Sequence, residues 1–260
     1  MPTLSKINLH PIKSFDPQMV DSAVLLASGA LEHDRRFVLC DRQGDCINGK
    51  SRPEIHRLRS DFDLNARVWS LRIEETPEVH RFHIDTQRAE LLAWLSDYFD
   101  ISVSLVENPD AGFPDDTDSP GPTVISTATL SEVGRWFGLD RAETRRRFRA
   151  NLEIDGVEPF WEDRLVAEGV GVVRFEIGEA QLLGTNPCQR CIVPTRSPST
   201  GEAIFAFAKT FAHSRQETLP PWAPASRFDH FYRLAVNTRP VNSRPCTIRV
   251  GDGVRILGND

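Results

Sequence analysis

Short runs of alternating hydrophobic and polar residues fill the first hundred positions of the chain, a pattern typical of β-strands. The runs lie at residues 4–9, 20–26, 36–40, 62–64 and 68–73. Turn-forming residues separate neighbouring runs, so that Arg42–Asp45 predicts one hairpin and Asn65–Arg67 a second. Strands of this length and spacing favour a barrel or a sandwich.

Helical spacing of hydrophobic residues predicts a helix over residues 86–99. Two further helices are expected where a capping residue is followed three positions later by glutamate. These pairs are Thr129 with Glu132 and Asp140 with Glu143. The pattern thus predicts that a helical segment interrupts the strands in the middle of the chain.

The second half of the chain returns to short hydrophobic runs, with Gly138 as the expected stop between the two capped helices. Strands are expected at residues 152–154, 170–175, 180–183, 231–236 and 254–257, and a helix at 205–213. Residues 108–122 are rich in acidic, turn-forming and proline positions, which is typical of a linker or a mobile loop. The pattern predicts a mixed, β-rich α+β protein with a barrel and a few helices.

The composition is that of an ordinary globular protein, with 40% hydrophobic and 26% charged residues. The net charge of -6 argues against a general nucleic-acid binder, which carries a basic face. No apolar stretch reaches the roughly 20 residues that span a bilayer, and the first residues carry no targeting pattern. A cytoplasmic protein is expected. Five cysteines form an odd set, which favours reduced thiols over a disulfide scaffold.

The most unusual local sequence is the Cys-x-x-Cys pair Cys188 and Cys191. Such a pair serves as half of a zinc site, as a redox dithiol, as a cofactor thiolate, or as two buried structural residues. Zinc would require two further ligands that the sequence does not offer nearby. A thioredoxin-like dithiol precedes a helix, which Pro194 and Pro198 prevent from starting at once. Arg190 beside the thiol favours its thiolate form.

A second set of polar residues forms a candidate anion site. Lys13 and Ser14 follow the end of a predicted strand, Arg36 opens another, and Arg149 ends a basic run two residues before Asn151. Each alone fits a solvent-facing position equally well. Together they would suit a phosphate, because lysine supplies a point charge and arginine a bidentate fork.

Ordered motifs in the chain resemble the MOSC family. The motifs are residues 10–14, 34–37, 149–156, 188–191, 198–201 and 249–252, and they cover nearly the whole chain. The resemblance implies a MOSC β-barrel domain over residues 121–260 packed with an N-terminal MOSC β-barrel-like domain over residues 1–120. Ala150, Gln189 and residues 48–52 depart from the family's pattern.

The resemblance implies a molybdenum-molybdopterin cofactor, as in the mitochondrial amidoxime reducing component and its bacterial relatives. Cys191 would be the metal ligand and catalytic residue, while Cys188 would be structural. The residues expected to hold the cofactor are Lys13, Ser14, Arg36, Arg149, Asn151, Gln189 and Arg190. The resemblance also implies binding of pyridoxal phosphate.

Two functions from different classes remain open at this point. The first is an oxidoreductase that reduces N-hydroxylated small molecules, with electrons from a separate ferredoxin, flavodoxin or cytochrome-type protein. The second is a carrier or insertion protein that holds the cofactor or a sulfur atom as a Cys191 persulfide, with Cys188 as the resolving thiol. Both need the same cysteine and an anion site, and the number of expected pterin contacts favours the enzyme.

Overall fold

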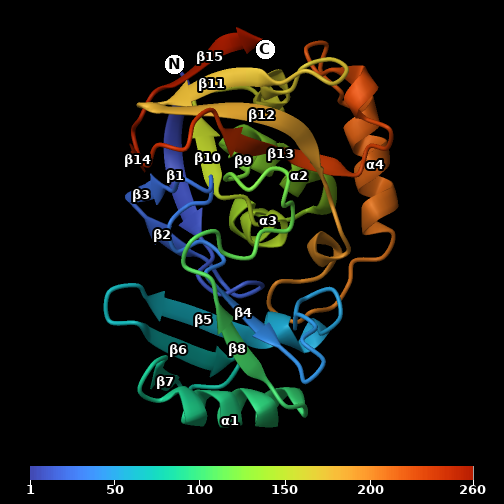
Figure 1. Cartoon of the computed structure of the whole chain (residues 1–260). Coiled ribbons are helices and arrows are strands. Elements are labelled where there is room, and N and C mark those ends of the chain that lie inside the picture. The colour runs from blue at the N-terminus through green and yellow to red at the C-terminus, as the bar shows by residue number, and fades with distance from the viewer. Residues whose placement is uncertain (260) are drawn as a thin grey trace.

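The computed structural model, which describes residues 1–259, is built around one large sheet with smaller sheets and a helix below it (Figure 1). The large sheet has eight strands in the order β15-β11-β12-β13-β9-β10-β1-β2. These strands are β1 Thr3–Leu9, β2 Gln18–Val20, β9 Val124–Ser126, β10 Leu152–Asp155, β11 Val173–Ile177, β12 Ala180–Gln189, β13 Arg233–Pro240 and β15 Val254–Asn259. The expected β-rich α+β class is confirmed.

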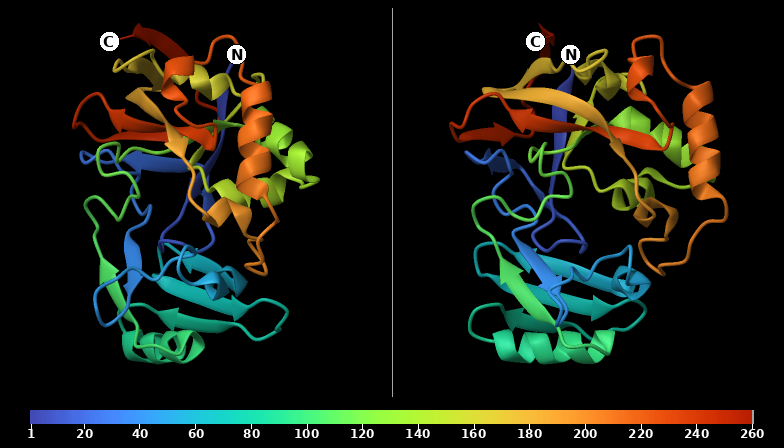
Figure 2. Two further views of the ribbon diagram at one scale, coloured as in Figure 1. Left: turned by 90° about the vertical axis from the view of Figure 1, so that its right-hand side faces the viewer. Right: turned by 45° about the vertical axis from the view of Figure 1, so that its right-hand side comes forward.

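Both faces of the large sheet are buried at its centre. Successive residues of a strand point to opposite faces, and in β9 Val124 packs in the core that contains Leu4, whereas Ile125 packs in the core that contains Phe148. The second core lies beneath helices α2 Thr127–Phe137, α3 Arg141–Phe148 and α4 Phe207–Glu217. Figure 2 shows these helices grouped on one side of the sheet.

A separate hydrophobic core holds the lower part together. Its strands are β4 Phe37–Cys40, β5 Leu58–Asp63, β6 Val68–Ile73, β7 His80–His83 and β8 Ser104–Glu107, and its helix is α1 Arg88–Phe99. Helix α1 buries Leu91, Leu95 and Phe99 against this core, where the fully buried Trp69 meets Phe15 edge to face. A two-stranded pair, β3 Ser22–Leu25 with β14 Cys246–Arg249, completes the strands.

Several predicted elements are confirmed. The second hairpin forms between β5 and β6, and α1 lies where the helical spacing placed it. The Asp140 side chain caps α3 by accepting a hydrogen bond of 2.7 Å from the backbone N–H of Glu143. Gly138 ends α2 with a positive φ of 66°, a conformation that favours glycine.

Two sequence-based expectations need correction. Helix α2 begins at Thr127 with Ser126 as its cap, because the hydroxyl of Thr129 is held by the buried Glu162. In the expected first hairpin, only the first segment, β4, forms a full strand. Strand β4 pairs along its length with β8, and the returning segment meets it at a single bridge between Cys40 and Cys46.

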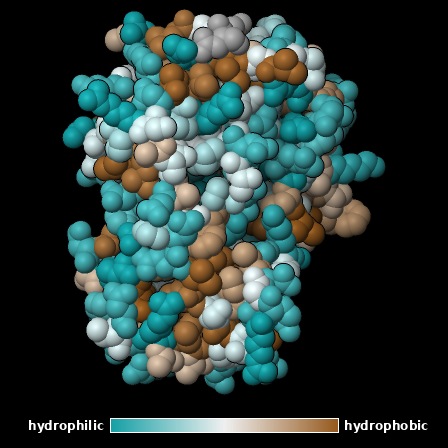
Figure 3. Space-filling model, in the orientation of Figure 1, coloured by the Kyte–Doolittle hydropathy of each residue, from teal (hydrophilic) through white to brown (hydrophobic). Residues whose placement is uncertain are grey.

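The remaining helical pieces are single turns: η1 Pro53–Arg57, η2 Trp161–Leu165, η3 Val193–Thr195 and η4 Ala225–Arg227. Both ends of the chain lie at the top in Figure 1. Hydrophilic side chains cover most of the face drawn in Figure 3, and hydrophobic ones gather at its top and in part of its lower half. No helix within residues 1–259 combines the length and the apolar composition that crossing a bilayer requires.

Candidate functional site

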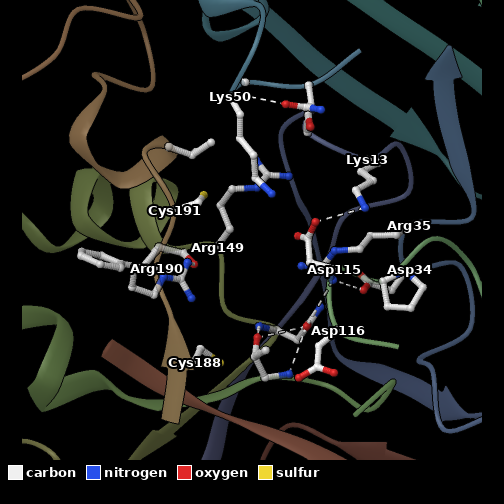
Figure 4. Close-up of a pocket in the computed structure, with 18 of the residues that line it drawn as sticks. Lys13, Asp34, Arg35, Lys50, Asp115, Asp116, Arg149, Cys188, Arg190 and Cys191 are labelled. Carbon is white, nitrogen blue, oxygen red and sulfur yellow. Dashed lines mark hydrogen bonds and ion pairs between the residues drawn. The ribbon is translucent and has the colours of Figure 1, made fainter. Parts of the chain in front are cut away.

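A cavity of about 780 Å³ lies where the large sheet meets the lower core. Its walls come from segments that are far apart in the sequence, within residues 13–16, 30–35, 46–59, 111–123, 146–151, 186–198 and 233–237. Figure 4 shows side chains from these segments pointing toward a common space. The volume is typical of a site for a small molecule or an organic cofactor.

Positive charge dominates the cavity wall. Ten lysine and arginine residues line it, namely Lys13, Arg35, Lys50, Arg59, Arg146, Arg147, Arg149, Arg190, Arg196 and Arg233. Four aspartates oppose them, namely Asp16, Asp34, Asp115 and Asp116. Since the whole chain has a net charge of -6, this excess of cations is local. Such a concave, positive surface attracts an anionic ligand.

Arg149 is a partly buried cation at this wall. It caps the C-terminus of α3 with a left-handed φ of 55°, and its Nη2 donates a hydrogen bond of 2.7 Å to the carbonyl of Phe15. Burial, and then the neighbouring charge of Arg35, lower the pKa of Arg149 to about 10. A lowered arginine pKa means that the surroundings disfavour the charge. An anion in the cavity would therefore stabilise Arg149.

The two cysteines of the Cys-x-x-Cys pair occupy different environments. Cys188 is buried within β12, where its thiol donates a hydrogen bond of 2.6 Å to Oδ1 of Asn237. Burial raises the pKa of Cys188 to about 11, although the charge of Arg190 acts in the opposite direction. Cys191 follows the end of β12, is only half-buried, and lines the cavity. Cys191 is thus the accessible thiol, and Cys188 remains protonated at neutral pH.

Arg190 lies between these two cysteines in Figure 4. Its Nη2 donates a hydrogen bond of 2.6 Å to the carbonyl of Phe148, and its guanidinium stands 5.5 Å from the centre of the Phe148 ring. Its Nε is buried and has no hydrogen-bond partner within the described residues 1–259. The side chain is therefore anchored at one end and leaves one buried donor unsatisfied.

The predicted Lys13 and Ser14 both line the cavity. Lys13 Nζ lies 3.1 Å from Oδ1 of Asp115 and donates a hydrogen bond of 3.0 Å to the carbonyl of Phe113. Ser14 has a left-handed φ of 77°. The loop at residues 108–122 thus does more than link two segments, because Asp115 and Phe113 hold the Lys13 amine at the cavity wall.

The structure does not bring Arg36 to the cavity. Its Nη2 lies 2.7 Å from Oε1 of Glu107 on β8, and Arg35 lines the cavity instead. Arg35 has a left-handed φ of 48°, so the chain turns sharply before β4 and sends the two side chains to different places. Position 35 could have been preferred from the sequence only if this turn had been recognised.

A buried hydrogen-bond cluster positions Arg35. It forms an ion pair with Asp34, and its backbone N–H donates to the carbonyl of His10 at 2.7 Å. The backbone N–H of His10 donates in turn to Oδ1 of Asp34 at 2.8 Å. Burial alone would raise the pKa of Asp34, but Arg35 and His10 lower it to about 2. Asp34 therefore remains charged and ties the two N-terminal motifs together.

Asn151 and Gln189 line the cavity in different ways. The amide of Asn151 is already used, since its Oδ1 accepts from Thr123 at 3.2 Å and its Nδ2 donates to the carbonyl of Asn8 at 3.0 Å. Asn151 therefore braces β1 against the segment that carries Arg149. Gln189 is the last residue of β12, and its side chain is exposed at the cavity. Its amide is therefore open to a ligand.

The structure adds residues that the sequence did not single out for the site. Among them are Arg35, Lys50, His56, Asp115 and Asp116. His56 is neutral at physiological pH, because burial lowers its pKa to about 4. The segment around Lys50 stood out in the sequence only as a departure from a family pattern. The spacing of residues along the chain therefore did not indicate that these side chains belong to the site.

Among residues 1–259, no cluster of three His, Cys, Asp or Glu side chains suited to a metal ion is present.

Family models match nearly the whole chain. A model described as the MOSC N-terminal beta barrel domain matches residues 1–111, and one described as the MOSC domain matches residues 123–255. The second match alone covers more than half of the chain.

Individual relatives are more distant. A molybdenum cofactor sulfurase of Danio rerio is 24% identical over 84% of this chain, and the mitochondrial amidoxime-reducing component 1 of Homo sapiens is 28% identical over 52% of it. These matches cover 33% and 36% of the two relatives, so the chain spans about a third of their length. A solved structure of a hypothetical protein aligns over 99% of this chain and 69% of its own, with a TM-score of 0.44 and 11% identity.

Proposed function

The chain belongs to the MOSC family, and on that premise we propose that it binds a molybdenum cofactor in the cation-lined cavity with Cys191 as the ligand to the metal. Similarity to a molybdenum cofactor sulfurase and to an amidoxime-reducing component supports a function related to this cofactor. The observation that carries the proposal is the placement of Cys191, a half-buried thiol in a wall that also presents ten lysine and arginine side chains.

The cavity residues fit an anionic, pterin-bound cofactor. Arg149 is a cation that its surroundings leave poorly compensated, and Arg190 keeps one buried N–H without a partner in the described chain. Charge-assisted hydrogen bonds from these two side chains would hold a phosphate group. Lys13 and Ser14 would contact the cofactor from the opposite wall, and Gln189 would contact it near the thiol. Arg36 is omitted from this set because it is paired with Glu107.

A soft thiolate such as that of Cys191 suits a sulfur-bound metal. When bound, the cofactor would supply two-electron redox chemistry, and we propose that it serves to reduce N-hydroxylated small molecules. The protein would hold the cofactor, keep Cys191 accessible and present a positive entrance. Electrons would come from a separate ferredoxin, flavodoxin or cytochrome-type protein in the cytoplasm. Pyridoxal phosphate binding stays a prediction.

A second candidate is a carrier that holds sulfur or the cofactor for delivery. It is favoured by the extent of the sulfurase matches, since the Homo sapiens sulfurase aligns over 96% of this chain at 20% identity. In that function Cys191 would carry a persulfide. Cys188 is a poor resolving thiol, because it is buried and its thiol is already engaged in a hydrogen bond of 2.6 Å to Oδ1 of Asn237. The carrier would therefore pass its sulfur to an external acceptor.

The test is the molybdenum content of protein purified without oxygen from a host that makes the cofactor. We expect close to one metal per chain in the wild type and a near-complete loss in Cys191→Ala, measured by elemental analysis. Cys188→Ala should be milder, and Cys246→Ala, whose thiol lies on β14, is the matched control. A metal-loaded wild type would then be assayed for benzamidoxime reduction.

Two outcomes would overturn the enzyme proposal. Equal loss of metal in Cys188→Ala and Cys191→Ala, with both variants folded, would indicate a dithiol site. Absence of metal together with a sulfur atom bound to Cys191, detected by intact-protein mass spectrometry, would favour the carrier.

A further inference from the structure

Two cysteines outside the Cys-x-x-Cys pair face each other across a short hairpin. Cys40 ends β4, and the chain returns after the turn so that Cys46 forms an antiparallel bridge with it. The flanking backbone hydrogen bonds run from Asp41 N to Asp45 O at 3.0 Å and from Ile47 N to Leu39 O at 2.8 Å. Cys40 and Cys46 are therefore a non-hydrogen-bonded pair, the closer of the two pair types in an antiparallel ladder.

This spacing is compatible with a disulfide. Cα atoms in such pairs lie about 4.5 Å apart, within the range of about 4.4 to 6.8 Å that disulfides span. Both thiols are free in the structure. Burial raises the pKa of Cys40, and an interaction with the Cys46 thiol acts in the same direction. Directly opposite residues of an antiparallel ladder project to the same face, so the two side chains are neighbours across the bridge.

The two thiols differ in access. Cys40 is buried, with 7% of its surface exposed, whereas Cys46 is exposed and lies at the cavity wall. An incoming disulfide can therefore reach Cys46 first, and Cys40 is placed beneath it to displace the leaving group. This pairing of an accessible thiol with a resolving neighbour is what thiol-disulfide exchange requires.

We propose that Cys40 and Cys46 form a redox-sensitive dithiol that closes to a disulfide by exchange with a low-molecular-weight disulfide such as oxidised glutathione. The Cys46 thiolate attacks one sulfur of oxidised glutathione and releases one glutathione thiolate. The Cys40 thiolate then attacks the Cys46 sulfur of the mixed disulfide and releases the second glutathione. The protein loses two electrons and two protons, and the glutathione disulfide gains them.

Closure would act on the cavity wall. The segment after Cys46 supplies Asn48, Gly49 and Lys50 to that wall, and Arg149 and Cys191 line the same cavity. A bond between Cys40 and Cys46 would tie the start of this segment to β4. The segment would then have fewer conformations available, so amide hydrogen exchange across residues 43–50 should slow.

The test is tryptic mapping of the full chain after incubation with oxidised glutathione. Arg42 lies between the two cysteines, so cleavage leaves Cys40 in peptide 37–42 and Cys46 in peptide 43–50. We expect these two peptides to be recovered joined, and to separate after dithiothreitol. Cys40→Ser and Cys46→Ser should each abolish the joined pair, whereas Cys246→Ser should leave it unchanged.

Three results would overturn the proposal. The first is the absence of the joined peptides, and the second is glutathione that stays attached to Cys46 in the wild type because Cys40 does not displace it. The third is hydrogen exchange across residues 43–50 that is equal in the oxidised and reduced protein, which would exclude an effect on the cavity wall.

Discussion

Neighbouring residues of the same type differ in this protein by what surrounds them. Cys188 and Cys191 are three positions apart, but burial raises the pKa of Cys188 to about 11 while Cys191 is half-buried at a cavity. Arg35 and Arg36 are adjacent, but only Arg35 lines that cavity. Residue type and spacing therefore indicate which chemistry is available. The local backbone decides which of two residues of the same type can perform it.

The first residue-scale prediction compares two arginines. Arg149→Gln should weaken binding of inorganic phosphate by about tenfold or more, because a hydrogen bond to a charged group contributes about 1.5–3 kcal/mol. The measurement is the rise in melting temperature as phosphate is added. Arg36→Gln removes the same charge from a side chain that Glu107 already neutralises, so it should respond to phosphate as the wild type does. Equal weakening in both variants would contradict the assignment of Arg149 to the site.

At the scale of elements, capping and buried polar groups decide where helices begin. The Ser126 hydroxyl caps α2 by accepting from Thr129 N at 3.0 Å, and the Thr129 hydroxyl donates to Glu162 Oε2 at 3.0 Å. Glu162 belongs to η2, so a contact between distant segments moved the helix start away from the position that the capping pattern predicted. Local sequence could not anticipate this contact.

Glu162 makes the stability of the fold depend on pH. It is almost fully buried, and burial together with the Asp163 carboxylate raises its pKa to about 7. A carboxyl group whose pKa is higher in the folded state contributes stability that is fully present below about pH 4.5, the usual carboxyl value, and is lost as the pH rises through 7. Glu162→Gln stays neutral and should avoid this loss.

The free energy of unfolding of Glu162→Gln, relative to wild type, should therefore rise by about 2–3 kcal/mol between pH 5 and pH 8. Urea unfolding at a series of pH values measures this difference. Glu158→Gln, which changes an exposed residue of the same segment, should show a constant difference across the series. A constant difference for Glu162→Gln as well would show that its carboxyl group is not perturbed.

At the scale of the whole molecule, the chain interleaves its two halves. Strand β1 lies between β10 and β2 in the large sheet, and Leu4 and Ile7 pack in one core with Val124 and Phe175. The segments 1–120 and 121–260 expected from the sequence therefore share a sheet. The cavity lies where the sheet meets the lower core, so it exists only when both segments are folded together.

A fragment of residues 121–260 should therefore fail to unfold cooperatively. Without β1 it would expose the edge of β10 and lose the hydrophobic contacts that Leu4 and Ile7 make in the shared core. Thermal unfolding followed by near-ultraviolet circular dichroism provides the measurement, with the full chain as the control. A sharp transition in the fragment would indicate that it is an independent domain.

The amino-acid sequence by itself determined the fold class, most of the elements and the motifs that indicate a thiolate beside an anion site. These properties follow from local periodicity, capping and residue type, which act over a few positions. Helix α3 is an example, since Asp140, Glu143 and Gly138 suffice to place its start and the end of α2.

Only the tertiary structure decided which side chains meet. Arg35 lines the cavity in place of Arg36 after a turn with left-handed residues at His33 and Arg35, and Lys50 and Asp115 reach it from loops without regular spacing. The hairpin expected after β4 kept only the bridge between Cys40 and Cys46, while β4 pairs along its length with β8. The physical reason is that burial and long-range pairing set the charge, access and direction of a side chain, and neither is encoded within a short window of sequence.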